Sequence, residues 1–272
     1  MTRNRLFALV TAMPVLCASL APLANAAGQA ERAPASSPVL QGNAVAAASV
    51  LAAPITRSRD FVYRLLRPEA PSGETIVLLH GSGGDEASLF KLASRSAPGA
   101  TLLGVRGRIV QKGIKRWYAK LSPTQFDQAD IRREARAFVD FLKARMAAEK
   151  LDPVRTTFIG YSNGANLIAA VSLLDPGLVH RAVLLRAMPV LEGVPAADLH
   201  RAHFLTVAGA RDGIYGPFAP ALESLLRDHG AIVDSRSVAA GHLLGDDDVK
   251  VVSQWLGTAT AVAGSTGTTA AQ

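Results

Sequence analysis

Short apolar runs alternate with longer amphipathic segments along most of the chain. The run 75–79 (Thr-Ile-Val-Leu-Leu) has almost no polar position, which is typical of a strand buried on both faces. Residues 127–149 instead repeat apolar side chains every three or four positions with charges between them, which predicts an amphipathic helix. Strands that alternate with helices in this way predict an α/β fold with a mostly parallel central sheet and helices on both faces.

The same patterns set the expected order of elements. We expect strands at 61–66, 75–79, 101–105, 156–159, 182–185, 204–208 and 231–233, and helices at 86–96, 127–149, 163–174, 218–228 and 246–256.

The N-terminus has the pattern of a targeting signal. Two arginines precede an uncharged apolar run over 6–23, and the triplet 24–26 (Ala-Asn-Ala) fits a signal-peptidase site. The alternative is a membrane anchor, but Pro14 interrupts the run and a polar, Pro-rich stretch follows it. We therefore expect a signal peptide over 1–26, cleavage after Ala26, and a periplasmic or secreted protein without a membrane span.

Composition defines two further segments. Residues 27–57 are rich in Ala, Pro, Ser and Gly and predict a flexible linker, and the Gly/Thr/Ala/Ser segment 258–272 predicts a disordered tail. One folded domain is then expected over 58–257.

Charge and cysteine content exclude several classes of function. Lys and Arg number 29 against 22 Asp and Glu, but the basic residues are scattered, so no nucleic-acid partner is expected. The single cysteine lies in the predicted signal peptide and excludes a disulfide framework or a Cys-based metal site. Without an HExxH motif or a His/Asp cluster, we expect no metal.

One motif suggests nucleophilic chemistry. Gly160-Tyr161-Ser162-Asn163-Gly164 follows a predicted strand and opens a predicted helix. A tight turn in that setting strains the serine and exposes its hydroxyl above the sheet. The alternative is that Ser162 only caps the helix.

A serine nucleophile needs a base and a group that orients the base. Among six histidines, His242 lies in a loop between the last predicted strand and the last helix. Asp212 follows the strand 204–208, at the end where such sheets place their sites. The order Ser162, Asp212, His242 is that of α/β-hydrolases. Asp212 could instead cap its own turn. The rival acids 246–248 suit a helix N-terminus better.

A glycine-rich loop, His80-Gly81-Ser82-Gly83-Gly84, ends the strand 75–79. It is typical of loops that supply half of an oxyanion hole, with the backbone N–H groups of Ser82 and Asn163 as donors and His80 orienting the loop. A dinucleotide loop does not fit, because the third glycine of GxGxxG is Glu86. The remaining alternative is a plain glycine turn.

Taken together, these motifs resemble the phospholipase/carboxylesterase family of α/β-hydrolases, which includes acyl-protein thioesterases and is related to dienelactone hydrolases. The resemblance covers about residues 60–257 and rests on the segments 79–86, 105–107, 116–118, 160–166, 186–189, 209–212 and 241–242. It implies a Ser162–His242–Asp212 triad, a body with little or no lid, and hydrolysis of small acyl esters without a cofactor.

The resemblance also implies that Trp117, Tyr118, Met188 and Pro189 border the acyl pocket, although core packing explains such residues equally well. The expected function is a serine carboxylesterase whose partner is a small-molecule ester. A lysophospholipase or acyl-thioesterase, which would need a long apolar groove, and a catalytically silent binding protein remain the alternatives.

Overall fold

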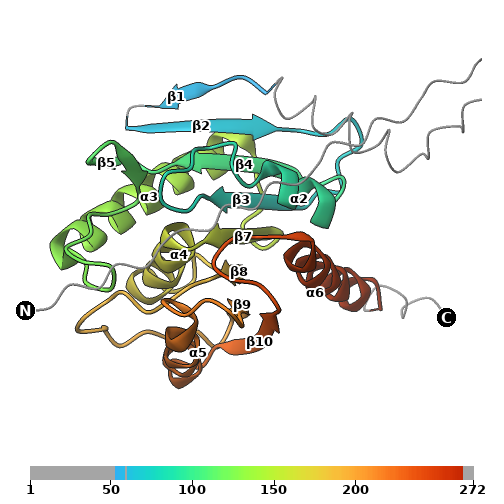
Figure 1. Cartoon of the computed structure of the whole chain (residues 1–272). Helices are drawn as coiled ribbons and strands as arrows, with labels where there is room; N and C mark the ends of the chain where they lie inside the picture. The colour runs from blue at the N-terminus through green and yellow to red at the C-terminus, as the bar shows by residue number, and fades with distance from the viewer. Residues whose placement is uncertain (1–52, 59, 266–272) are drawn as a thin grey trace, which may run out of the picture. The chain divides into compact units, whose positions relative to one another are not determined.

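The computed structural model describes residues 53–58 and 60–265. The predicted signal peptide, and the predicted linker up to residue 52, lie outside these ranges. An eight-stranded sheet forms the centre of the described chain, in the order β1-β2-β4-β3-β7-β8-β9-β10 (Figure 1). Its strands are β1 (Thr56–Ser58), β2 (Phe61–Leu66), β3 (Thr75–Leu79), β4 (Thr101–Arg106), β7 (Thr156–Tyr161), β8 (Arg181–Leu185), β9 (His203–Gly209) and β10 (Ile232–Val238).

The sheet is parallel from β4 to β10, whereas β1 and β2 pair antiparallel at one edge. All five residues of β3 are buried, and their side chains alternate between two cores. Val77 and Leu79 pack in one core, and Ile76 and Leu78 pack in the other. The predicted α/β architecture with helices on both faces is therefore confirmed.

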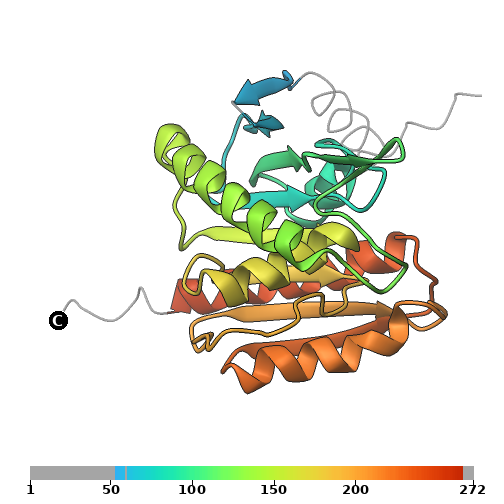
Figure 2. The same ribbon diagram turned by 90° about the vertical axis from the view of Figure 1, so that its left-hand side faces the viewer.

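The helices cover the two faces separately (Figures 1 and 2). One core receives side chains from α3 (Gln128–Glu149), α4 (Asn163–Leu174) and α5 (Ala219–Asp228). The other receives them from α2 (Phe90–Ser96) and α6 (Asp246–Ser265). A single 3-10 turn, η1 (Gly216–Phe218), precedes α5.

Several predicted boundaries differ from the structure at element ends, and strand β10 continues to Val238, past the predicted end at 233. Helix α2 begins at Phe90 and not at residue 86, because Asp85 folds the preceding segment into a turn by accepting the N–H of Ala87. Helix α6 continues to Ser265, past the predicted end at 256 and into the predicted tail. Three alanines between Gly257 and Gly264 favour this, since alanine is the best helix former and each glycine costs only about 1 kcal/mol.

Another difference is at the end of the predicted linker. Residues 56–58 form the edge strand β1, in which Thr56 pairs with Tyr63 of β2. So short a strand on the sheet edge has no hydrophobic alternation of its own, and only its pairing with β2 defines it.

A small hairpin was not predicted from the pattern. Strands β5 (Ile109–Gln111) and β6 (Ile114–Arg116) pair antiparallel around Lys112 and Gly113, which both have positive φ (52° and 76°). Two such residues form the tight turn that suits a two-residue hairpin loop. The hairpin delivers Arg116 to the carboxyl edge of the sheet, where the candidate site lies.

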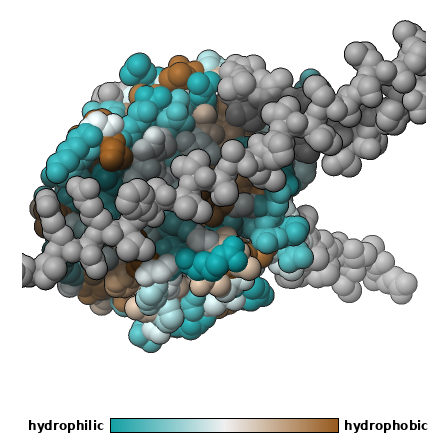
Figure 3. Space-filling view, viewed as in Figure 1, coloured by the Kyte–Doolittle hydropathy of each residue, from teal (hydrophilic) through white to brown (hydrophobic). Residues whose placement is uncertain are grey.

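Hydrophilic and hydrophobic residues are interspersed on the face seen in Figure 3. Across 53–58 and 60–265, none of the helices combines the length and the apolar character that crossing a bilayer requires.

Candidate active site

Ser162 lies at the sharp turn between β7 and α4. Its φ of 50° and ψ of −114° fall in a strained region for a residue with a side chain. The flanking glycines permit the turn, because a Cβ on Gly160 would lie 2.6 Å from the backbone of Ala165 and one on Gly164 would lie 2.3 Å from the Leu79 carbonyl oxygen. The strain holds the Ser162 hydroxyl outward at the start of a helix.

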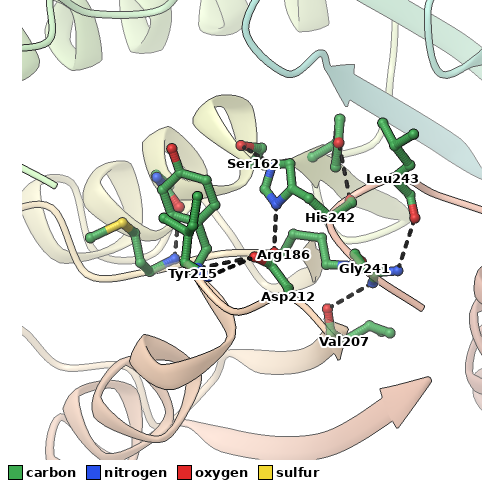
Figure 4. A network of polar contacts seen from close by, with 12 residues as sticks. Ser162, Arg186, Val207, Asp212, Tyr215, Gly241, His242 and Leu243 are labelled. Carbon is green, nitrogen blue, oxygen red and sulfur yellow. Dashed lines mark hydrogen bonds and ion pairs between the residues drawn. The ribbon is translucent and has the colours of Figure 1, made fainter. Parts of the chain in front are cut away.

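The structure brings Ser162 together with His242 and Asp212 (Figure 4). The His242 Nε2 lies 3.0 Å from the Ser162 Oγ, and its Nδ1 lies 2.6 Å from the Asp212 Oδ2. The second carboxylate oxygen of Asp212 accepts the backbone N–H groups of Tyr215 (3.0 Å) and Ile214 (3.3 Å). A base and an acid are thus aligned on one hydroxyl.

The surroundings of Asp212 favour its ionised form. Only 4% of its side chain is exposed, and burial raises its pKa. The hydrogen bonds from His242 and from the backbone of Tyr215 and Ile214 lower the pKa by more, so the net shift is downward. A carboxylate that stays charged can orient the imidazole and stabilise it when protonated.

Two tyrosines flank the imidazole. The Tyr161 and Tyr215 rings lie 5.3 and 4.8 Å from the His242 ring, centroid to centroid. The Tyr161 hydroxyl donates to the His242 carbonyl oxygen at 3.1 Å. These contacts fix both the ring and the backbone of the candidate base.

Arg186 lies against the His242 loop, next to Gly241 (Figure 4), and forms a buried ion pair. Arg186 makes two hydrogen bonds with Asp248, at 2.8 and 3.1 Å, and neither side chain is exposed. The same guanidinium donates to the carbonyl oxygens of Gly241 (2.9 Å) and Leu243 (3.4 Å), on either side of His242. The pair therefore ties the loop to β8 and to the first turn of α6.

The glycine-rich loop is held by His80, as the sequence suggested. Its Nδ1 lies 2.7 Å from the Gly81 carbonyl oxygen, and its Nε2 accepts the N–H of Gly107 at 3.0 Å. Burial lowers the pKa of His80, which keeps the ring neutral and suited to accept that N–H. The indole of Trp117 donates to the His80 carbonyl oxygen at 2.9 Å.

A pocket of about 370 Å³ opens beside Ser162 and His242. Both residues predicted to supply the oxyanion hole, Ser82 and Asn163, line it. The other lining residues are Arg116, Tyr118, Lys120, Phe126, Tyr161, Asn166, Arg186, Met188, Tyr215 and Leu243.

The four predicted acyl-pocket residues divide into two pairs. Tyr118 and Met188 line the pocket. Trp117 does not line it, because its ring is buried in the core against His80 and Phe138. Pro189 does not line it either, and it is half-buried. Trp117 therefore belongs to the hydrophobic core.

Asparagine side chains hold the pocket walls. Asn163 Oδ1 accepts the N–H of Trp117 at 2.7 Å. Asn166 Oδ1 accepts the N–H of Met188 at 2.8 Å, and its Nδ2 donates to the Tyr118 hydroxyl at 3.1 Å. Both asparagines follow Ser162 closely in the chain. The N-terminal end of α4 therefore positions the Ser162 hydroxyl and also the segments that contain Tyr118 and Met188.

Several of these residues were not predicted as functional. Arg186 stands directly before the Ala-Met-Pro segment, and Asp248 belongs to the acidic start of α6, but neither position alone indicates a partner. The sequence does not show that residues 62 positions apart form an ion pair. Arg116 belongs to the segment 116–118 on which the resemblance rests, but nothing in that segment indicated that its side chain lines the pocket, and Tyr215 and Lys120 lie outside the motifs.

Comparisons with known proteins identify related hydrolases. No protein-family model matches the sequence. The chain is 31% identical over 189 residues to "Putative hydrolase MhqD" of Bacillus subtilis (strain 168), covering 68% of this chain and 92% of that protein.

Two solved structures are also similar. The carboxylesterase from Mesorhizobium loti is 48% identical with a TM-score of 0.74, covering 75% of this chain and 98% of the other. The Bacillus cereus carboxylesterase is 27% identical with a TM-score of 0.70, covering 74% and 96%. These relatives support a hydrolase or esterase function. Together with the fold, they show that the chain belongs to the phospholipase/carboxylesterase family of α/β-hydrolases.

Proposed function

We propose that the protein is a serine carboxylesterase that hydrolyses small acyl esters through an acyl-enzyme intermediate. The observation that carries the proposal is the continuous hydrogen-bonded series from Asp212 through His242 to the strained Ser162. Neither a helix cap nor a plain binding site needs an imidazole aligned on that hydroxyl.

In the first step, the Ser162 Oγ attacks the ester carbonyl carbon while the His242 Nε2 takes the hydroxyl proton. Asp212 stabilises the imidazolium and holds its tautomer. The oxyanion is held by the backbone N–H groups of Ser82 and Asn163, of which the second belongs to the first turn of α4, where N–H groups have no partner within the helix.

The intermediate then collapses. The bond to the alcohol oxygen breaks and His242 gives its proton to that oxygen, which leaves an acyl group on Ser162. Water repeats the sequence on the acyl-enzyme with His242 as the base. The products are one carboxylic acid and one alcohol, and no cofactor takes part.

The pocket favours short acyl groups. Its walls include hydroxyl, amide and cationic groups besides Phe126 and Met188, whereas a lysophospholipase needs a long apolar groove. We expect kcat/KM for 4-nitrophenyl esters to be highest for acetate to butyrate and to fall steadily toward palmitate. A maximum at palmitate, or faster cleavage of lysophospholipids or acyl thioesters, would instead favour the alternative activities.

The matched controls for this assay are two serine variants. Ser162→Ala removes the proposed nucleophile, whereas Ser237→Ala alters an exposed serine on β10. We expect the first to abolish turnover and the second to leave it unchanged. Turnover by Ser162→Ala equal to that of the wild type would refute the mechanism. A folded wild type that is inactive on every ester would favour a catalytically silent binding protein.

We also propose that residues 1–26 direct export. The mass of the protein recovered from the periplasm or medium of a bacterial host should correspond to a chain that begins at Ala27. An unprocessed chain retained inside the cell would contradict this.

A further inference from the structure

The pocket beside Ser162 carries an excess of positive charge. Among the described residues, those that line it include Arg116, Lys120 and Arg186 but no aspartate or glutamate. Asp248 neutralises Arg186 in the buried pair described above. Arg116 and Lys120 have no such counter-ion among the described residues, so their charges are available to a substrate in the pocket.

Arg116 ends strand β6, at the open end of the hairpin, and the carbonyl oxygen of the preceding Lys115 accepts the N–H of Gly83 in the glycine-rich loop at 2.8 Å. One of its N–H groups donates to the Ser82 hydroxyl at 2.7 Å. Within residues 53–58 and 60–265, no carboxylate lies within ion-pair distance of this guanidinium, and its buried Nε has no hydrogen-bond partner. A guanidinium has five N–H groups in a fixed fork that matches a carboxylate, so most of its capacity is unused.

Lys120 lies on the wall of the pocket next to Tyr215. Its Nζ donates to the Tyr215 hydroxyl at 3.3 Å and lies 5.7 and 5.5 Å from the ring centroids of Phe126 and Tyr215. No acidic side chain of the described chain forms an ion pair with it. Because the Tyr215 ring also packs on His242, the ammonium is fixed close to the candidate base.

These contacts extend the proposed function to a substrate class, and the extension rests on that function. We propose that the physiological substrate is an ester that carries a free carboxylate, which Arg116 and Lys120 bind while Ser162 attacks the ester group. Hydrolysis breaks the acyl carbon–oxygen bond, adds water across it and leaves the substrate carboxylate unchanged. Hydrogen bonds between charged groups in a partly enclosed pocket are strong enough to select such an ester over a neutral one.

The competing explanation for Arg116 is structural. Through the Ser82 hydroxyl it could simply orient the loop whose N–H group faces the oxyanion, and its loss would then slow every ester equally. Lys120 has no contact of that kind with the loop. The two explanations are distinguished by the ratio of rates on charged and neutral esters.

The experiment compares matched esters. On the alcohol side, 4-acetoxybenzoate is paired with the neutral 4-acetoxyacetophenone; on the acyl side, mono-4-nitrophenyl adipate is paired with 4-nitrophenyl hexanoate. We expect the wild type to have a kcat/KM at least about tenfold higher for the anionic member of one pair, and this preference to decrease with added salt.

Three variants assign the preference to residues. Arg116→Gln and Lys120→Gln should each lower kcat/KM for the anionic ester about tenfold more than for its neutral partner. Lys112→Gln, at the exposed turn of the same hairpin, removes an equal charge and should leave both values unchanged. An equal loss on both esters in Arg116→Gln and Lys120→Gln, or no anion preference in the wild type, would overturn the proposal.

A binding measurement separates this proposal from the catalytic one. Calorimetric titration of Ser162→Ala with each ester should show tighter binding of the anionic one, and Lys120→Gln in the same background should remove the difference. Anion-selective binding without turnover by the wild type would refute the esterase mechanism alone. Turnover without anion selectivity would refute only the substrate class.

Discussion

The carboxylate of Asp212 is expected to act only through the imidazole that it orients. In Asp212→Asn, an amide oxygen can still accept the backbone N–H groups, but the amide N–H favours the wrong tautomer of His242. Triads of this type lose about 10⁴-fold in kcat from that change. We expect a loss of this order with KM altered little, measured with 4-nitrophenyl acetate.

The control for Asp212→Asn is the thermal unfolding midpoint, which should stay within a few degrees of the wild-type value. A variant that folds normally and keeps more than about a tenth of the wild-type kcat would show that Asp212 only closes its own turn.

Among the secondary-structure elements, the loop between β10 and α6 depends on the buried pair Arg186–Asp248. Asp248→Ala leaves a buried guanidinium without its counter-ion, which is expected to destabilise the protein by about 3–5 kcal/mol. The double variant Arg186→Met/Asp248→Leu removes both charges and should recover most of that stability, because well-packed apolar residues often replace a buried ion pair. Urea unfolding measures the free energy of unfolding of the single and the double variant.

The double variant also separates the effect of the ion pair on stability from its effect on the position of His242. The carbonyl groups of Gly241 and Leu243 lose their donor in it, so kcat should stay well below the wild-type value although stability returns. A double variant with wild-type kcat would show that the pair stabilises the fold without positioning His242.

A second buried carboxylate makes stability depend on pH. Glu86, 2% exposed, forms ion pairs with Arg106 of β4 (2.6 Å) and Arg64 of β2 (3.4 Å). Burial raises its pKa, but the hydrogen bond and charge of Arg106 lower it by more, so its folded pKa lies below the ordinary value of 4.5. The contribution of Glu86 to the free energy of unfolding is therefore complete above about pH 4.5. It is lost as the pH falls through the lower folded pKa.

We expect the free energy of unfolding to fall between about pH 5 and pH 3, and Glu86→Gln to show a flatter fall from a lower starting value. Denaturant unfolding at several pH values provides the comparison. A variant with the wild-type slope would show that Glu86 does not contribute to the acid sensitivity.

The elements with strong patterns were predictable from the sequence, and those defined by pairing were not. Strands β2 and β3 and helix α4 have the predicted bounds, since apolar runs and the Ser162 turn mark their ends. The edge strand β1 and the β5–β6 hairpin are three residues per strand, too short for a period to show. For the same reason the place of Arg116 in the pocket was not predicted, although Arg116 belongs to a motif segment.

At the scale of the whole molecule, the parallel sheet gathers residues that are far apart in the chain. Ser162 follows β7, Asp212 follows β9 and His242 follows β10, so all three lie at the carboxyl edge of the sheet. Motif and order in the sequence were enough to predict that these three residues lie together. The positive pocket depends on the packing of Lys120 between two rings, which no spacing in the sequence encodes.

The central claim, that His242 activates Ser162 as a nucleophile, is tested most directly by a fluorophosphonate probe. The purified wild type is treated beside Ser162→Ala, His242→Ala and Ser237→Ala, and the adduct is located by peptide mass. Labelling at Ser162 in the wild type and in Ser237→Ala, but in neither of the other two variants, is the predicted result. A folded wild type that takes no label, or takes it at another residue, would contradict the account.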